Sequence, residues 1–217
     1  MRKNKYAKSA VIFPGVSLGE GGEIEDFVLI GKPYSHKPPK ALSPKTMIGD
    51  NFNIRSHAVI YCANKIGDNF TTGHHVLVRQ GNIIGDNVSI GSGTVIEHHV
   101  KIGNNVRIHS KAFVPEYSVL EDNCWIGPAA VLTNTYHPKC PKAKECLRGP
   151  IIKKGAIIGA NATILPGIII GENALVGAGA VVVSSVKPDS VVVGNPARKI
   201  KSIKGLKCLS GITKRPY

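Results

Sequence analysis

An aliphatic residue recurs at every sixth position through most of this chain. Fifteen positions from Ile48 to Leu132 keep this spacing, and fourteen of them are aliphatic, with Thr72 as the exception. The same phase holds earlier at Ile12, Leu18, Ile24 and Ile30, and it resumes after residue 150 shifted by two, at Ile152, Ile158, Ile164, Ile170, Val176 and Val182. A period of six fits neither the 3.6-residue turn of a helix nor the plain alternation of a strand. It predicts short strands joined by corners, with the aliphatic side chain pointing inward.

A second repeat of 18 residues overlies the first. The segment IGDNF begins at residues 48 and 66, IGDNV at 84, IGNNV at 102 and LEDNC at 120. Asp and Asn suit the backbone of tight corners. Three hexads per turn make a triangular coil, in which residues i and i+18 stack at the strand spacing of about 4.8 Å. We therefore predict an all-β fold, a parallel β-helix of about eight triangular coils.

Two segments interrupt the repeat. Residues 32–47 contain four prolines, and residues 134–150 are rich in lysine and proline. We predict that both leave the β-helix as loops and that the second is functional, since long loops within a compact domain usually are. The β-helix domain is expected over residues 1–200. The basic tail, residues 201–217, continues an apolar stripe that is compatible with a short helix: Ile200, Ile203, Leu206 and Leu209.

The chain is strongly basic, with 28 Lys and Arg against 14 Asp and Glu, a formal net charge of +14. Such a surplus is typical of nucleic-acid binding, but no aromatic cluster accompanies the lysines to stack on bases. The cations gather in residues 134–154 and in the tail, which favours a small anionic ligand over a nucleic acid.

The cysteines and the apolar segments bear on location. The five cysteines have irregular spacing, which disfavours a disulfide framework and favours a reducing cytoplasm. We expect no signal peptide and no membrane span. His137, Cys140 and Cys146 offer three zinc ligands without a paired CxxC, so we predict no metal requirement.

Residues 159–183 (GANATILPGIIIGENALVGAGAVVV) and 192–200 (VVGNPARKI) resemble the C-terminal coils of the hexapeptide-repeat acyltransferases. That resemblance implies a left-handed coil and acetyl-CoA bound between the subunits of a homotrimer.

Within that family, residues 96–103 (IEHHVKIG) and 126–138 (IGPAAVLTNTYHP) most resemble nucleotide-sugar N-acetyltransferases. The resemblance implies transfer of an acetyl group to the amino group of a nucleotide-linked aminosugar, in surface-polysaccharide or glycan synthesis. The chain departs from the pattern at His137, which instead resembles the base of the sugar O-acetyltransferases. An O-acetyltransferase that uses His137 is therefore the alternative.

The 18-residue stacking suggests where acyl transfer could occur. It places one column at a corner of the coil: Cys62, Gln80, His98, Glu116 and Asn134. Acyl transfer needs a proton acceptor and donors to the developing oxyanion. We predict His98 as the base, because imidazole titrates near neutral pH, with His137 as the second candidate. Asn134 is expected to hold the acceptor sugar or the acetyl carbonyl.

We also predict contacts to both substrates. The acceptor is expected to meet Glu97, which could instead orient His98, and further His74, Arg79 and Glu116. Three glycines, Gly159, Gly177 and Gly179, are expected to let the pantetheine approach, with the amides of the last two facing the thioester carbonyl. Arg198 and Lys199 would bind the phosphates of the coenzyme.

Two other classes of protein are open alternatives. A γ-type zinc carbonic anhydrase resembles this chain in its histidines, but that pattern contains two histidines five residues apart and no pair here has that spacing. A non-catalytic β-helix scaffold is the other alternative.

Overall fold

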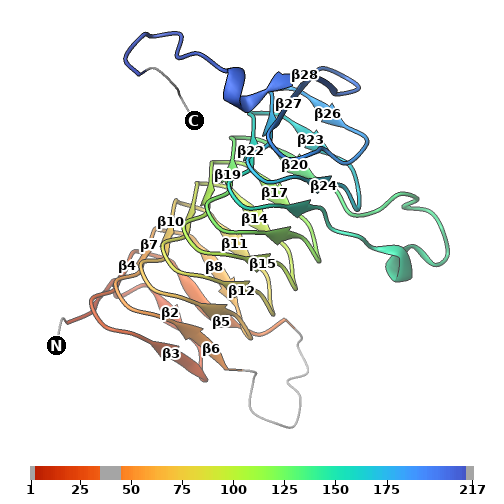
Figure 1. Cartoon of the computed structure of the whole chain (residues 1–217). Helices are drawn as coiled ribbons and strands as arrows, with labels where there is room; N and C mark the ends of the chain where they lie inside the picture. Colours follow the sequence, from red (N-terminus) through yellow and green to blue (C-terminus); the bar gives the residue numbers. More distant parts are fainter. Residues whose placement is uncertain (1–2, 35–44, 214–217) are drawn as a thin grey trace.

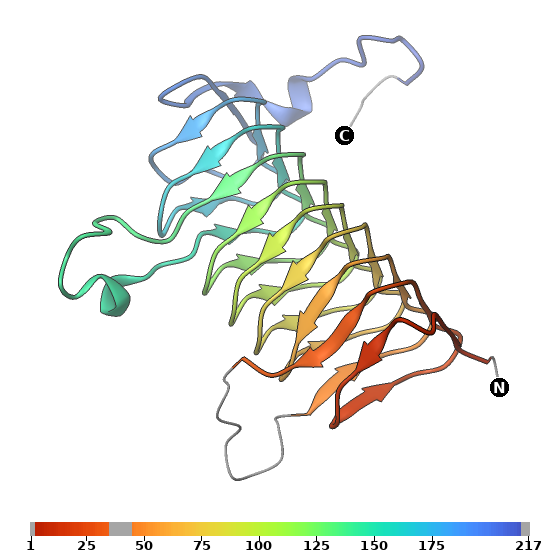
Figure 2. The same cartoon turned by 180° about the vertical axis from the view of Figure 1, so that it is seen from behind.

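The computed structural model describes residues 3–34 and 45–213 of the chain. Short strands form the three faces of an elongated triangular prism, and each turn of the chain adds one strand to each face (Figures 1 and 2). Within the prism, strands on successive turns pair in parallel, and away from the excursions most partners are 18 residues apart, for example Ile54 beside Thr72 and Ile84 beside Ile102. The predicted all-β parallel β-helix is confirmed, and the coil is consistent with the left-handed form that the resemblance implies.

The first sheet has eleven strands. In spatial order they are β1 (Lys5–Tyr6), β4 (Glu23–Ile24), β7 (Asn53–Ile54), β10 (Thr71–Thr72), β13 (Ser89–Ile90), β16 (Arg107–Ile108), β19 (Trp125–Ile126), β22 (Ile157–Ile158), β25 (Leu175–Val176), β27 (Ser190–Val193) and β28 (Arg198–Ser202).

The second sheet has nine strands. They are β2 (Val11–Ile12), β5 (Leu29–Lys32), β8 (Val59–Tyr61), β11 (Leu77–Val78), β14 (Val95–Ile96), β17 (Phe113–Val114), β20 (Val131–Leu132), β23 (Thr163–Ile164) and β26 (Val181–Val182).

The third sheet has eight strands. They are β3 (Val16–Leu18), β6 (Thr46–Ile48), β9 (Lys65–Ile66), β12 (Ile83–Ile84), β15 (Lys101–Ile102), β18 (Val119–Leu120), β21 (Ile151–Ile152) and β24 (Ile169–Ile170).

The predicted count of about eight coils is too low. Ten strands of the first sheet, all except the antiparallel β28, belong to successive turns, so the described β-helix has about ten turns. The extra turns lie at the two ends of the prism. There β1 pairs with β4 and β27 pairs with β25, beyond the positions from which the coils were counted in the sequence. Backbone pairing can extend the coil where the sequence repeat has ended.

The hexad positions form the core. From Ile24 to Val182 their side chains point into the prism, and residues such as Ile54, Ile96 and Ile126 are fully buried. Thr72, the exception in the sequence, is also buried, and its Oγ1 accepts a hydrogen bond from the backbone N–H of Arg55 at 3.1 Å. The buried hydroxyl is therefore paired, which removes most of the cost of placing a polar group in this core.

The 18-residue repeat corresponds to a ladder of side-chain hydrogen bonds at one corner. The backbone N–H of Asp50 donates to Asp68 Oδ1 at 2.7 Å, and that of Asp68 donates to Asp86 Oδ1 at 2.8 Å. The Asn that follows each of these residues has a left-handed backbone, with φ near 55° at Asn51, Asn69 and Asn87. Asn tolerates that conformation better than most residues, which explains the Asp-Asn pair in each repeat.

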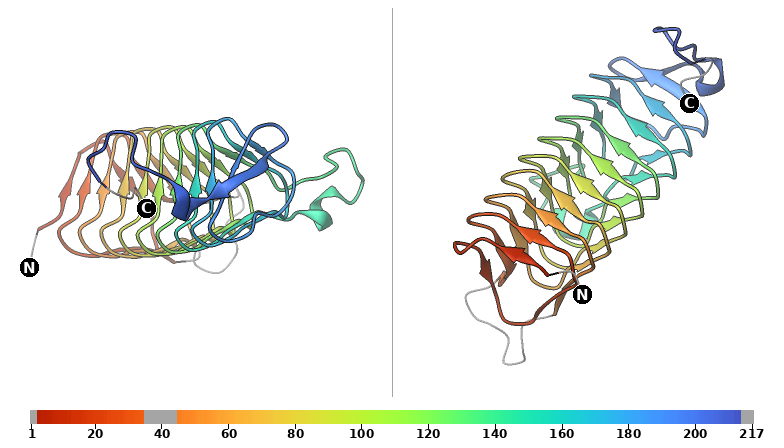
Figure 3. Two further views of the ribbon diagram at one scale, coloured as in Figure 1. Left: turned by 45° about the horizontal axis from the view of Figure 1, so that its top comes forward. Right: turned by 90° about the vertical axis from the view of Figure 1, so that its left-hand side faces the viewer.

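Both predicted excursions are found where the hexad breaks. The first joins β5 to β6, and residues 35–44 within it lie outside the described residues. The second joins β20 to β21, contains the 3₁₀ turn η1 (Ala143–Cys146) and projects from the prism (Figures 1 and 3).

The tail differs from its prediction. It returns as β28, antiparallel to β27, followed by the single 3₁₀ turn η2 (Ile203–Gly205). Only Ile203 of the apolar stripe is buried, whereas Ile200 and Leu209 are exposed. Hydrogen bonds to the open edge of β27 thus replace a helix packed on the prism. No helix in the described ranges is long and apolar enough to cross a membrane.

Candidate functional site

Three side chains of the predicted column lie in contact at the corner between the second and third sheets. His98 follows β14, Glu116 follows β17 and Asn134 follows β20, so each occupies the same place on successive turns. Glu116 bridges the other two: its Oε2 accepts from Asn134 Nδ2 at 2.7 Å, and its Oε1 lies 3.5 Å from His98 Nε2. The carboxylate of Glu116 therefore links the candidate base to the candidate substrate amide.

The environment of His98 favours one tautomer. Its Nδ1 lies 2.8 Å from Nδ1 of His99, so one of these two nitrogens donates and the other accepts. The nearby Glu116 carboxylate favours a proton on His98 Nε2, which makes His98 Nδ1 the acceptor from His99. The ring of Tyr117 covers both histidines, at centroid distances of 6.0 Å from His98 and 5.8 Å from His99.

Glu97 and Arg79 extend this cluster by one turn. Arg79 Nη1 lies 3.5 Å from Glu97 Oε2, and its guanidinium also lies over the ring of Tyr61. Glu97 therefore has Arg79 as its charged partner. The structure thus brings together five of the predicted residues: Arg79, Glu97, His98, Glu116 and Asn134.

The same corner contains a group of potential metal ligands. One atom from each of Glu97, His98 and Glu116 lies within 4.8 Å of the others, and it is the one such group in the described chain. Arg79 already supplies a positive charge to Glu97, so the group has an internal counter-ion for one of its two carboxylates. His137, Cys140 and Cys146 do not form such a group within the described residues.

His137 and His74 lie apart from the column. His137 is exposed on the excursion after β20, and no hydrogen bond or ion pair within the described residues joins it to His98 or Asn134. His74 is at the corner between the first and second sheets, where its Nδ1 lies 2.8 Å from Ser56 Oγ and 3.8 Å from Glu25 Oε2.

The excursion forms a groove beside the column. Asn134 O accepts from the backbone N–H of Arg148 at 2.9 Å, and this bond closes the base of the loop. Exposed Lys144 and Arg148, with the acidic Glu145 between them in sequence, then line a groove of about 460 Å³ next to Tyr117 and the outer surface of the third sheet. The clustering of cations in residues 134–154 was the signal for this groove. That Tyr117 would line the same groove had no signal in the sequence.

Arg198 and Lys199 line a second groove of about 660 Å³ at the C-terminal end, together with residues 182–187. Both cations are exposed on β28. With Lys187, which is also exposed, the groove therefore presents three positive charges beside an apolar floor that includes Val182 and Val192.

The three predicted glycines have different environments. A Cβ on Gly159 or Gly177 would meet the next turn at 2.5 Å or 2.7 Å, so coil packing requires these two glycines. Gly179 has open space around its missing side chain and a φ of 68°. The amides of Gly177 and Gly179 already donate to Val192 O and Ala160 O, both at 2.8 Å, so they are not free to face a thioester carbonyl in this conformation.

The model of the bacterial transferase hexapeptide (six repeats) matches residues 83–116 and 149–184, which flank the excursion and include His98 and Glu116. These two segments, about a third of the chain, therefore match the hexapeptide repeat of bacterial transferases.

Two relatives of this hexapeptide-repeat protein are named 2,3,4,5-tetrahydropyridine-2,6-dicarboxylate N-acetyltransferase. The protein from Halalkalibacterium halodurans is 52% identical over 81 residues, which is 37% of this chain and 31% of the relative. The protein from Alkaliphilus metalliredigens is 49% identical over 80 residues, with the same two shares of 37% and 31%. The match spans about a third of each relative's length.

A solved structure supports the fold. A UDP-N-acetylglucosamine acyltransferase from Bacteroides fragilis 9343 aligns over 90% of this hexapeptide-repeat protein and 74% of its own chain, with a TM-score of 0.60 and 19% identity. At that identity the likeness concerns the architecture of the β-helix alone.

Proposed function

We propose that this hexapeptide-repeat protein is an acetyl-CoA-dependent N-acetyltransferase that acts on an amine of an anionic acceptor. The observation that carries the proposal is the contact of His98, Glu116 and Asn134 beside a groove with two cations, Lys144 and Arg148. The N-acetyltransferase activity in the names of the relatives supports the same reaction.

The column suits the proton transfers of this reaction. Attack of an amine on a thioester carbonyl forms a C–N bond and leaves an extra proton on nitrogen, and expulsion of the thiolate requires a proton on sulfur. His98 would accept the first proton at Nδ1, once His99 gives up its hydrogen bond to that nitrogen, and return it to the leaving sulfur. Glu116 would stabilise the imidazolium that forms in between, since opposite charges at 3.5 Å attract in a partly buried site.

The two grooves suit the two substrates. Lys144 and Arg148 would pair with the negative charges of the acceptor, and Arg198 and Lys199 with the phosphates of the coenzyme. Gly179, with open space at its Cα, is the predicted glycine that would best allow the pantetheine to approach.

Two acceptor classes fit the cationic groove. The first is a nucleotide-linked aminosugar, whose diphosphate carries negative charge, as the resemblance of residues 96–103 and 126–138 implies. The second is a small dicarboxylate, which the names of the relatives suggest. We place the aminosugar first, because the chain matches those relatives over only 31% of their length.

A homotrimer with sites between subunits fits the outer surface of the second sheet. Its outward-facing residues are nearly all apolar along the prism: Val11, Leu29, Val59, Leu77, Val95, Phe113, Val131, Thr163 and Val181. Burial of such a face against other copies would remove apolar area from water.

The test is release of free thiol from acetyl-CoA in the presence of nucleoside-diphosphate aminosugars and, separately, of 2,3,4,5-tetrahydropyridine-2,6-dicarboxylate. We expect turnover with one class, a fall in kcat of at least a hundredfold for His98→Asn, and little change for His137→Ala. No turnover with any acceptor, together with unchanged thermal unfolding on addition of CoA, would contradict the proposal and favour a scaffold. A large loss in His137→Ala alone would favour the O-acetyltransferase.

A further inference from the structure

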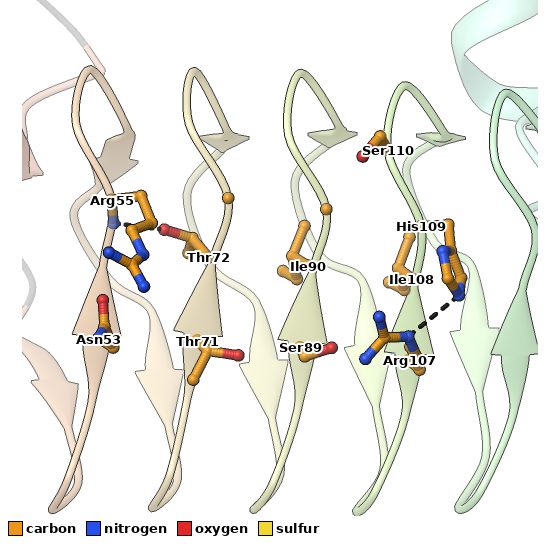
Figure 4. A pocket seen from close by; sticks show the side chains of 12 residues that line it. Asn53, Arg55, Thr71, Thr72, Ser89, Ile90, Arg107, Ile108, His109 and Ser110 are labelled. Carbon is orange, nitrogen blue, oxygen red and sulfur yellow. Dashed lines mark hydrogen bonds between the residues drawn. The ribbon is translucent and has the colours of Figure 1, made fainter.

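A shallow groove crosses the outer face of the first sheet, on the side of the prism away from the His98 corner (Figure 4). Its volume is about 390 Å³, and it extends over the turns that contain β7, β10, β13 and β16. At about 4.8 Å per turn, the groove is roughly 14 Å long.

The groove arises from two neighbouring columns of side chains. One column rises from the strands, with Asn53, Thr71, Ser89 and Arg107 on successive turns. In the other, at the start of the corner, Gly73 and Gly91 lie between Arg55 and His109. Large side chains at both ends and bare backbone between them leave a hollow bordered by hydroxyl groups.

Arg107 is oriented for an anion at one end of this hollow. Its Nε donates to Nε2 of His109 at 3.0 Å, and the His109 ring packs on Trp125 with centroids 4.6 Å apart. The terminal nitrogens of the guanidinium are then left on the side of Ser89, as Figure 4 shows. No carboxylate forms an ion pair with Arg107 in the described chain, whereas Arg55 at the other end is paired with Glu25. A fixed guanidinium with its terminal nitrogens free matches a phosphate or a carboxylate.

Two further observations concern the other end of the groove, near Arg55. Asn53 Oδ1 is shielded from water and has no hydrogen-bond partner, which is rare for a buried amide oxygen. Thr72, the one polar residue among the fifteen hexad positions, bonds to the backbone N–H of Arg55 and so fixes that end of the groove. The single exception in the repeat is therefore a buried core residue whose hydroxyl also holds the backbone at this end of the groove.

We propose that this groove binds a polyhydroxylated anion, namely a sugar that carries a phosphate or a carboxylate. Arg107 takes the anionic group, and the side chains of Ser89 and Thr71 bond to the ring hydroxyls on the next two turns. The site is independent of the proposed acetyl transfer, since none of these residues lies in the His98 column or in the two cationic grooves already described.

The test is isothermal titration calorimetry, in which the full chain is titrated with glucose 1-phosphate or with glucuronate. Neutral glucose and inorganic phosphate are titrated as comparisons. We expect at least one sugar anion to bind, and to bind at least tenfold more weakly to Arg107→Gln. Ser89→Val should weaken binding similarly, because it fills the groove and removes a hydroxyl while valine suits a strand. Lys65→Gln, which removes an exposed cation from β9 on the third sheet, should leave binding unchanged.

Three outcomes would overturn the proposal. They are no binding of either sugar anion, equal weakening in Lys65→Gln and Arg107→Gln, and inorganic phosphate binding as tightly as the sugar anions. Thermal unfolding of each variant separates loss of the site from loss of the fold. Because the titration contains no acetyl donor, its result is distinct from a failure of the proposed acetyl transfer.

Discussion

At the scale of single residues, Glu116 has the most consequential contacts, because it joins His98 to Asn134. Stacking at 18 residues predicted that the three would share a column, and that juxtaposition is confirmed. The bridging geometry came from the structure, since the repeat specifies position on the coil and not the rotamer that turns each carboxylate oxygen toward a different neighbour.

We expect Glu116→Gln to lower kcat of the acetyl transfer by about tenfold or more with a smaller effect on KM. The substitution keeps an acceptor for Asn134 but removes the charge that stabilises a protonated His98. Steady-state kinetics of Glu116→Gln, His98→Asn and the double variant provide the measurement. If the two residues act as a unit, the double variant is no slower than His98→Asn, and fully additive losses would contradict the coupling.

His109 gives a pH-dependent contribution to stability. Burial, and then the charge of Arg107, hold the pKa of His109 below its usual value of 6.5 in the folded chain. As pH falls, the unfolded chain therefore binds the proton before the folded chain does. The contribution of neutral His109 to the free energy of unfolding is complete above pH 6.5 and is lost as pH falls below it. We expect the fall in Tm between pH 7.5 and pH 5 to be smaller in His109→Gln than in the unsubstituted chain. Equal falls in Tm would show that His109 does not contribute.

At the scale of elements, the corner ladder explains every letter of the repeated Ile-Gly-Asp-Asn segment. Ile fills the core and Asn takes the left-handed corner. Gly is required because a Cβ at Gly67 would lie 2.1 Å from Asp86 Oδ1 on the next turn. Where the repeat reads Leu-Glu-Asp-Asn, the next turn has Lys154 in place of Asp, and Glu121 instead accepts from Lys153 Nζ and the Lys154 backbone.

Loss of one rung should measure the strength of this ladder. We expect Asp86→Ala to lower the free energy of unfolding by about 1 kcal/mol, since it leaves the Asp68 N–H without its acceptor. Asp86→Asn keeps the acceptor, as Asn104 does naturally on the following turn, and should cost less than half as much. Urea unfolding of both variants is the measurement, and equal losses would mean that the charge of Asp86 matters more than the hydrogen bond.

At the scale of the whole molecule, the apolar outer face of the second sheet predicts assembly. We expect light scattering after size exclusion to give a mass about three times the 23.1 kDa of the chain. Phe113→Asp introduces a charge into this face and should lower that mass, whereas Lys65→Asp on the third sheet should not. If the unsubstituted chain is monomeric, the trimer is ruled out. If the mass of Phe113→Asp is unchanged, the interface lies on another face of the prism.

The sequence by itself determined the prism, because its repeat is periodic. Each hexad predicts one strand and each group of 18 residues one turn, so the strand pairing, the core, the ladder and the column of His98, Glu116 and Asn134 follow from counting. Tertiary structure alone decided what has no period: the closing of the excursion beside Tyr117, the return of the tail as β28, and the orientation of the Arg107 side chain toward His109. These features depend on contacts between segments whose separation in the sequence does not follow the 18-residue repeat. They also depend on side-chain rotamers, which select one partner among several within reach.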